Sequence, residues 1–239
     1  KLLFNKNSFV TEKKYKFNQS IILKNLEFSY NKNHKVLDNV NLIIEKNSSI
    51  GLIGKSGSGK STFANIMTGL LTPSKGEILI DNDVLIKRYI NLSNTISYVP
   101  QNIFLTPDTI RKNVAFGLSN EEIDENKVYS SLKKAKLESL IESLPKGIET
   151  KVGERGSLFS GGQIQRIGIA RALYRDPEIL ILDEATSSLD KETEREFMNL
   201  IQGMSKDLTL IIISHNFDLI KFCDKKFEIN SGKFIEKKW

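Results

Sequence analysis

The chain contains several short apolar runs, each bounded by polar residues. The clearest are Ile50–Ile53, Ile179–Leu182 and Leu208–Ile213, each of strand length and rich in β-branched residues. Such runs are typical of strands buried on both faces of a parallel sheet. The pattern predicts further strands at Ile21–Tyr30, Val36–Glu45, Ile78–Ile80 and Thr95–Val99, and a terminal hairpin that turns at Asn230–Gly232.

Helical periodicity separates these runs. Lys191–Met204 carries Phe197, Leu200, Ile201 and Met204 at positions i, i+3, i+4 and i+7, which form one apolar stripe on a helix. The remaining predicted helices are Ser61–Leu70, Gln163–Arg175, which stops before Pro177, and a short one near Phe217–Phe222. Strands that alternate with helices predict an α/β fold with a mainly parallel sheet and helices on both faces.

A segment of different character interrupts this alternation. Between Thr109 and Leu144 the chain is charged, poor in strand formers and helically spaced, which indicates an inserted helical subdomain at about residues 102–165. Residues 1–19 are polar and basic without periodicity, so we expect a linker from a transmembrane domain outside this sequence. Residues 20–239 are predicted to form one domain.

Composition excludes several classes of protein. The 239 residues carry a net charge of +6, with lysines scattered singly or in pairs, so a nucleic-acid-binding patch is not indicated. One cysteine allows no internal disulfide, and two histidines leave no zinc cluster. The first residues are too polar for a signal peptide, and no apolar run reaches the roughly 20 residues of a spanning helix. We expect the fragment itself to be soluble.

A glycine-rich loop follows the run Ile50–Ile53. Residues Gly54–Ser61 read GKSGSGKS and fit the phosphate-loop pattern, with a predicted strand before and a helix after. Glycines let backbone N–H groups curl around phosphates, Lys60 reaches the β- and γ-phosphates, and the Ser61 hydroxyl binds Mg²⁺. A glycine-rich turn with an incidental lysine is the alternative interpretation, and the strand and helix context disfavours it.

Two acids end the apolar run Ile179–Leu182. Ligands of open α/β sheets bind beyond the carboxyl ends of the strands, so Asp183 is expected near the magnesium. Glu184 is placed to orient or deprotonate the attacking water. A helix cap or a solvated loop acid is the alternative for either carboxylate.

Spaced motifs beyond these two resemble the ABC ATPases. Phe159–Gln163 (FSGGQ) resembles the LSGGQ signature of that family, and Ser187–Asp190 (SSLD) resembles its D-loop. Gln101, His215 and Tyr30 resemble the Q-loop glutamine, the switch histidine and the aromatic residue that stacks on adenine. The match runs from about Ile21 to the C-terminus in family order. Phe159 in place of leucine and Ser188 in place of alanine are small departures that remove no catalytic group.

The resemblance implies a P-loop NTPase (RecA-like) core, an N-terminal antiparallel β subdomain and an inserted helical subdomain. It also implies ATP and Mg²⁺ as ligands and a head-to-tail homodimer, in which the partner's signature covers ATP on the phosphate loop. A Ser160-capped helix N-terminus is a second anion site, which agrees with two shared nucleotides. The resemblance assigns Glu184, His215 and Gln101 to catalysis and Ser61, Gln101 and Asp183 to the metal. It assigns to the nucleotide Tyr30, Gly54, Lys55, Ser56, Gly57, Ser58, Gly59, Lys60, Ser61, Thr62, Ser160, Gly161, Gly162, Gln163 and Asp190.

Thr150–Gly156 (TKVGERG) resembles the X-loop of exporter-type cassettes, which contacts transmembrane coupling helices. Together with the Q-loop region, it implies contact with a transmembrane domain of the same polypeptide, at the cytoplasmic face of the membrane. The segments around Gln101–Leu105 and Thr109–Gly117 look similar to bacterial exporters, including lipid flippases. We therefore expect the ATP-hydrolysing domain of an exporter or flippase, with no nucleic-acid partner.

Other interpretations stay open for single residues and for the whole chain. The alternative for His215 is a core histidine, and the alternative for Tyr30 is an aromatic residue that only packs. The alternative for Gln101 is a surface residue, and that for Asp190 is a helix N-cap. The main alternative function is a soluble ABC ATPase that acts on nucleic acid or ribosomes. A regulatory module that binds nucleotide without turnover is disfavoured by the intact Glu184 and His215, and a GTPase by the absence of an Asn-Lys-x-Asp run.

Overall fold

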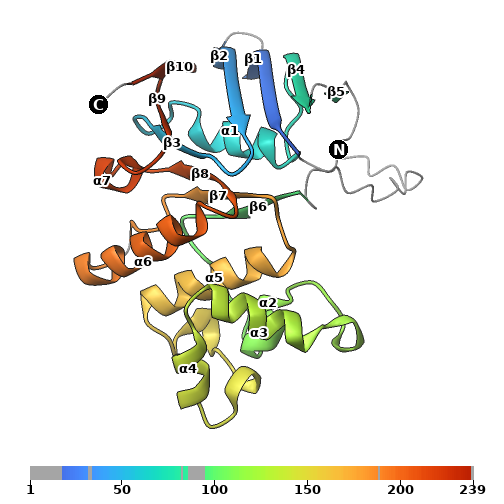
Figure 1. Ribbon diagram of the computed structural model, residues 1–239, viewed down its shortest axis with the longest axis vertical. Helices are drawn as coiled ribbons and strands as arrows, with labels where there is room; N and C mark the ends of the chain where they lie inside the picture. The colour runs from blue at the N-terminus through green and yellow to red at the C-terminus, as the bar shows by residue number, and fades with distance from the viewer. Residues whose placement is uncertain (1–17, 32–33, 82, 86–94, 188, 238–239) are drawn as a thin grey trace.

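The strands of the computed structural model form two sheets (Figure 1). The structure describes residues 18–31, 34–81, 83–85, 95–187 and 189–237. The strands are β1 (Ser20–Asn31), β2 (His34–Glu45), β3 (Ser49–Ile53), β4 (Lys75–Ile80), β5 (Asp83–Leu85), β6 (Ile96–Val99), β7 (Ile179–Asp183), β8 (Thr209–Ile213), β9 (Lys225–Asn230) and β10 (Lys233–Glu236). The α-helices are α1 (Lys60–Met67), α2 (Ile110–Val114), α3 (Glu125–Lys134), α4 (Glu138–Ser143), α5 (Gly161–Tyr174), α6 (Lys191–Met204) and α7 (Phe217–Ile220).

The larger sheet has the order β10-β9-β3-β8-β7-β6. All its neighbouring strands pair in parallel except β9 and β10, which form the C-terminal antiparallel hairpin. Every residue of β7 and β8 is buried, as expected for strands covered on both faces. The predicted α/β fold with a mainly parallel sheet is confirmed.

Alternate side chains of the central strands enter two different cores. Ile179 and Ile181 of β7 pack with Phe63 and Met67 of α1, whereas Leu180 and Leu182 pack in the core that contains α5 and α6. The alternation follows from the period of two residues in a strand. Helix α1 therefore covers one face of the sheet, and α5 and α6 cover the other (Figure 1).

The smaller sheet has the order β2-β1-β4-β5 and is antiparallel throughout. Its apolar residues, among them Leu23, Val40 and Ile44, share a core with α1. This sheet is the predicted N-terminal antiparallel subdomain. Strand β5 was not predicted, because three residues carry too little periodicity to be recognised.

Helices α2, α3 and α4 lie between β6 and β7 along the chain, in the segment that was predicted to be helical. Their buried residues, including Val114, Val128 and Ile141, pack into the same core as α5. Several predicted helix ends differ by one to three residues. For example, α1 stops at Met67 with Thr68 as C-cap, and α5 begins at Gly161 because Ser160 is its N-cap. Within the described residues, no helix is both long and apolar enough to cross a bilayer. Most of the predicted arm, residues 1–17, lies outside the described residues.

Candidate functional site

The glycine-rich loop connects β3 to the N-terminus of α1. Gly59, the N-cap of α1, has φ 110°, and a Cβ at this position would lie 2.8 Å from the Val36 carbonyl oxygen. A Cβ on Gly54 would lie 2.6 Å from both the Ile229 carbonyl oxygen and Ser58 Oγ. Only glycine fits at these two positions, so the loop closes tightly enough for backbone N–H groups to face a phosphate.

Lys60 is the first residue of α1 and is buried. Its ammonium donates hydrogen bonds to the carbonyl oxygens of Gly54 (2.7 Å) and Lys55 (3.0 Å). Burial lowers the pKa of Lys60, while the negative charges of Glu184 and Asp183 raise it. Backbone carbonyl groups of the loop therefore hold the Lys60 ammonium, and two carboxylates are near enough to affect its pKa.

Three hydroxyl and carboxylate groups meet at the carboxyl end of β7. Asp183 is buried, and its Oδ2 accepts hydrogen bonds from Tyr98 Oη (2.8 Å) and Ser61 Oγ (3.4 Å). Burial raises the pKa of the Asp183 carboxyl, and the charge of Glu184 adds to that rise. The hydrogen bonds from Tyr98 and Ser61 act in the opposite direction. A hydroxyl and a carboxylate beside a phosphate loop fit Mg²⁺, which prefers oxygen ligands.

Tyr98 is a site residue that the sequence did not reveal as one. It lies on β6, opposite Ile181 of β7, and burial together with Asp183 raises the pKa of its phenol. The phenol therefore stays protonated and donates to the carboxylate. The only sign of this role in the sequence was a tyrosine three residues before Gln101. Without the register of β6 and β7, such a tyrosine cannot be distinguished from one that only packs in the core.

Glu184 and His215 form a pair. His215 Nε2 lies 2.7 Å from Glu184 Oε1, the glutamate side chain being the more buried of the two. The pairing follows from topology, because β7 and β8 are adjacent and parallel with Asp183 opposite Ile213. Glu184 has φ 49°, a strained conformation for a residue with a Cβ that costs about 1–3 kcal/mol. Its N–H donates to the Ile213 carbonyl oxygen (2.8 Å), which holds that conformation in place.

Gln101 and Tyr30 approach the same region from other elements. Gln101 Nε2 donates to Ser187 Oγ (3.1 Å), three residues after Glu184. The Tyr30 ring is 60% exposed, packs edge-on against Phe28, and has its hydroxyl 3.2 Å from Thr62 Oγ1. An exposed ring anchored beside the phosphate-loop helix has the position required to stack on a base.

The signature segment lies on the other side of the sheet. Ser160 and Gln163 form a capping box at the start of α5, and a Cβ on Gly162 would lie 2.3 Å from Thr193 Cγ2 of α6. Asp190 is the N-cap of α6, as predicted, and accepts from the N–H groups of Glu192 and Thr193. Among the described residues, no hydrogen bond joins Ser160–Gln163 to the phosphate loop, and α1 and α5 pack in different cores. Lys55, Ser56 and Gly57 are exposed, and Ser188 lies outside the described residues.

Comparisons with known proteins agree with this geometry. The family model described as "ABC transporter" matches residues 37–187. The ATP-dependent lipid A-core flippase of Francisella novicida is 40% identical over 222 residues, covering 92% of this chain and 37% of that protein. ABC transporter B family member 6 of Dictyostelium discoideum is 39% identical, covering 91% of this chain and 33% of that protein.

Among solved structures, a bacterial Atm1-family ABC exporter with ATP bound is similar with a TM-score of 0.81 and 33% identity, covering 93% of this chain and 39% of that one. This chain thus spans little more than a third of the length of such relatives. The predicted family resemblance is confirmed. The phosphate loop with its buried lysine, the two acids at the end of β7 and the signature at the start of α5 all lie within the matched region, so the chain belongs to the ABC transporter family.

Proposed function

We propose that this chain binds ATP with Mg²⁺ and hydrolyses it, and that it is the motor domain of an exporter or flippase. One observation carries the hydrolytic part of the proposal. The loop that holds Lys60, the Ser61–Asp183 pair and the Glu184–His215 pair converge at the carboxyl ends of β7 and β8. Phosphoryl transfer needs positioning and charge compensation more than covalent chemistry, and this arrangement offers both.

Each group has a distinct part in the proposal. The loop N–H groups and Lys60 bind the phosphates, Ser61 and Asp183 hold Mg²⁺ with Gln101 nearby, and Tyr30 stacks on the adenine. Bound Mg²⁺ compensates phosphate charge. Glu184 orients the attacking water and accepts its proton, and His215 fixes the Glu184 carboxylate through their 2.7 Å contact.

The signature supports a site shared between two chains. Ser160 caps α5, whose N-terminus favours an anion, yet this N-terminus and the chain's own phosphate loop belong to opposite faces of the sheet. A head-to-tail pair of chains places the partner's Ser160–Gln163 over the nucleotide. ATP binding then closes the pair and hydrolysis reopens it.

Contact with a transmembrane domain is supported by the surface around Thr150–Gly156. Val152 and Thr150 in this segment exchange backbone hydrogen bonds with Asp108 and Ile110, which fixes the segment on the helical subdomain. Nearby in the sequence, the large apolar side chains of Phe104 and Leu158 are exposed to 59% and 68%, so apolar surface is available there for a partner. The similarities to a flippase and an exporter favour a membrane transporter, with this domain at the cytoplasmic face.

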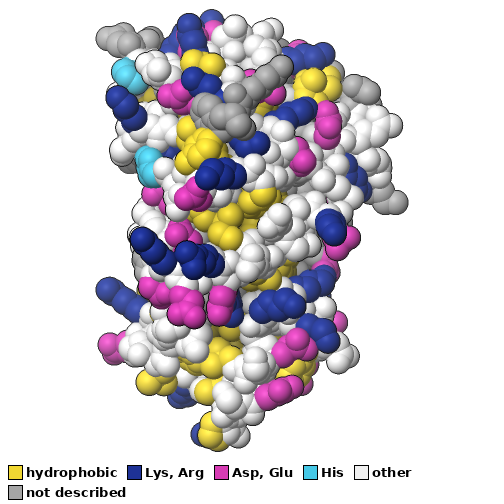
Figure 2. All heavy atoms as spheres, turned by 60° about the vertical axis from the view of Figure 1, so that its left-hand side comes forward, with side chains coloured by type: hydrophobic (Ala, Val, Ile, Leu, Met, Phe, Trp, Pro, Cys, Tyr) yellow, Lys and Arg dark blue, Asp and Glu magenta, His cyan; other side chains and the backbone are white. Residues whose placement is uncertain are grey.

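The face of the molecule shown in Figure 2 gives no support to a nucleic-acid partner. Lys and Arg side chains alternate with Asp and Glu over the face shown in Figure 2, and apolar side chains cross its middle. A nucleic-acid interface requires a continuous basic surface. This face carries none.

The hydrolytic part is tested with Glu184→Gln, which keeps the size of the side chain and removes its basicity. We expect turnover to fall by about a hundredfold or more, while the dissociation constant for ATP changes little, because the phosphate-binding groups are untouched. Glu192→Gln, an exposed acid on α6, is the matched control and keeps its turnover. Wild-type turnover in Glu184→Gln contradicts the assigned chemistry.

A further inference from the structure

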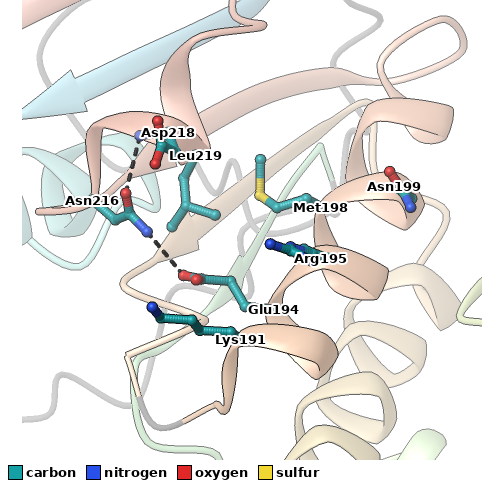
Figure 3. A pocket seen from close by; sticks show the side chains of 8 residues that line it. All are labelled: Lys191, Glu194, Arg195, Met198, Asn199, Asn216, Asp218 and Leu219. Carbon is teal, nitrogen blue, oxygen red and sulfur yellow. Dashed lines mark hydrogen bonds between the residues drawn. The ribbon is translucent and has the colours of Figure 1, made fainter.

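Glu194 lies in the first turn of α6. It joins the segment that follows Glu184 to the segment that follows His215. Its Oε1 accepts one hydrogen bond from Thr186 Oγ1 (3.1 Å) and another from Asn216 Nδ2 (3.0 Å). Figure 3 shows the carboxylate pointing from α6 across a groove of about 450 Å³ toward Asn216 at the start of α7. We call the three residues Thr186, Glu194 and Asn216 the clasp.

The two outer members of the clasp are close in sequence to the proposed catalytic pair. Thr186 comes two residues after Glu184, and Asn216 directly follows His215. Thr186 is buried and lies within a tight turn, where Ser187 N–H donates to the Glu184 carbonyl oxygen. A shift of Thr186 is therefore transmitted through this turn to the backbone of Glu184.

Asn216 has each of its polar groups engaged. Its backbone N–H donates to Ser214 Oγ (2.9 Å), its Oδ1 accepts from the N–H of Asp218 as the N-cap of α7, and its Nδ2 donates to Glu194. The side chain of Asn216 is thus oriented by α6 as well as by α7. These hydrogen bonds therefore also constrain the peptide group between Asn216 and His215.

We propose that Glu194 is a positioning residue that holds the Glu184 segment and the His215 segment at a fixed separation. The proposal rests on the function proposed above for Glu184 and His215. Glu194 makes no hydrogen bond to either of them among the described residues, so it acts through Thr186 and Asn216. The 2.7 Å contact between Glu184 and His215 depends on two loops from different strands, and the clasp is a second, independent link between those loops.

The hydrogen bonds of the clasp determine which substitutions test its role. Both donors use the same oxygen, Oε1, so Glu194→Gln can retain an acceptor whereas Glu194→Ala cannot. Thr186→Val removes one donor with little change of shape, and Thr186→Ser retains it. Asn216→Asp keeps the N-cap oxygen of α7 but places a carboxylate against Glu194, and adding Glu194→Gln restores a donor–acceptor pair in the reverse direction.

The experiment measures turnover, the dissociation constant for ATP and the melting temperature of each variant of the 239-residue chain. We expect Glu194→Ala, Thr186→Val and Asn216→Asp to lower kcat by roughly ten- to a hundredfold with ATP affinity unchanged, as misplacement of reacting groups does. Glu194→Gln and Thr186→Ser should stay near wild type, and the Asn216→Asp, Glu194→Gln double variant should recover most of the lost kcat. Glu192→Ala on the same helix controls for loss of an acid.

Two results overturn the proposal: wild-type kcat in both Glu194→Ala and Thr186→Val, or no recovery of kcat in the double variant. A merely structural role shows itself as a lower melting temperature with unchanged kcat per folded molecule, which also overturns it. Glu184→Gln in the same assay separates this proposal from the proposed function. If Glu184→Gln is inactive and the clasp variants are normal, only the clasp fails. If Glu184→Gln retains turnover, the assigned chemistry fails.

Discussion

Gly162→Ala tests why the second signature glycine is required. The added Cβ would lie 2.3 Å from Thr193 Cγ2, well inside the separation of about 3.5–4.0 Å at which two carbons pack. Thr193 is not free to turn away, because its Oγ1 donates to Asp190 Oδ2 (2.7 Å). Either α5 and α6 separate or this hydrogen bond breaks, so the substitution strains the contact between the two helices.

The magnitude follows from the two opposing effects. Overpacking of this kind costs about 1–3 kcal/mol. Replacing glycine with alanine in a helix returns at most about 1 kcal/mol. With the full gain subtracted, the net loss is up to about 2 kcal/mol, which lowers Tm by up to roughly 8 °C in a domain of this size.

Thermal unfolding of three variants and the wild type measures the effect. Thr193→Ser removes the clashing methyl and keeps the hydroxyl, so the Gly162→Ala, Thr193→Ser double variant should recover most of the lost Tm. Gly203→Ala on α6 is the matched control, since a Cβ there meets nothing within 4 Å, and it should be neutral or slightly stabilising. If Gly162→Ala melts like wild type, or if Thr193→Ser gives no relief, the close helix contact is not what requires glycine. Turnover of the double variant then shows whether the glycine also serves the nucleotide.

Two further predictions concern Asp183 at the proposed metal site and Tyr30, the residue proposed to stack on adenine. Burial raises the pKa of Asp183 above its unfolded value, so its contribution to stability is complete below the unfolded pKa and is lost as pH rises through the folded pKa. In EDTA, the Tm of the wild type should therefore fall relative to Asp183→Asn as pH rises through that window, and parallel melting curves would refute the burial effect. Tyr30→Ala should weaken ATP binding by roughly 5- to 100-fold because base stacking contributes about 1–3 kcal/mol, whereas Tyr30→Phe keeps the ring and most of the affinity in a nucleotide titration.

The sequence predicts those features that have a local pattern. Strands β3, β7 and β8 are continuous apolar runs because both sheet faces are covered, and the phosphate loop has fixed residue types because its backbone must close around an anion. Asp190 and Ser160 are recognisable as N-caps for the same reason, since capping needs a short polar side chain at one position.

Other features exist only through tertiary contacts. Tyr98 reaches Asp183 because β6 and β7 are neighbouring strands. Glu194 reaches Asn216 because α6 and the start of α7 line the same groove. Gly162 lies close to Thr193 because α5 and α6 approach closely there. None of these pairs has a spacing in the sequence that distinguishes it from chance. They become visible only with the sheet order and the helix packing.

The dependence of ATP turnover on protein concentration tests the shared two-chain site most directly. With Mg²⁺ present, the total rate should rise faster than linearly with the concentration of the wild-type chain, because two chains must meet before Glu184 can act. A mixture of Lys60→Ala and Ser160→Arg, each inactive alone, should regain part of the turnover, since one of the two shared sites is then intact. A rate strictly proportional to concentration, with no recovery in the mixture, would contradict the shared site and leave each chain as a complete ATPase.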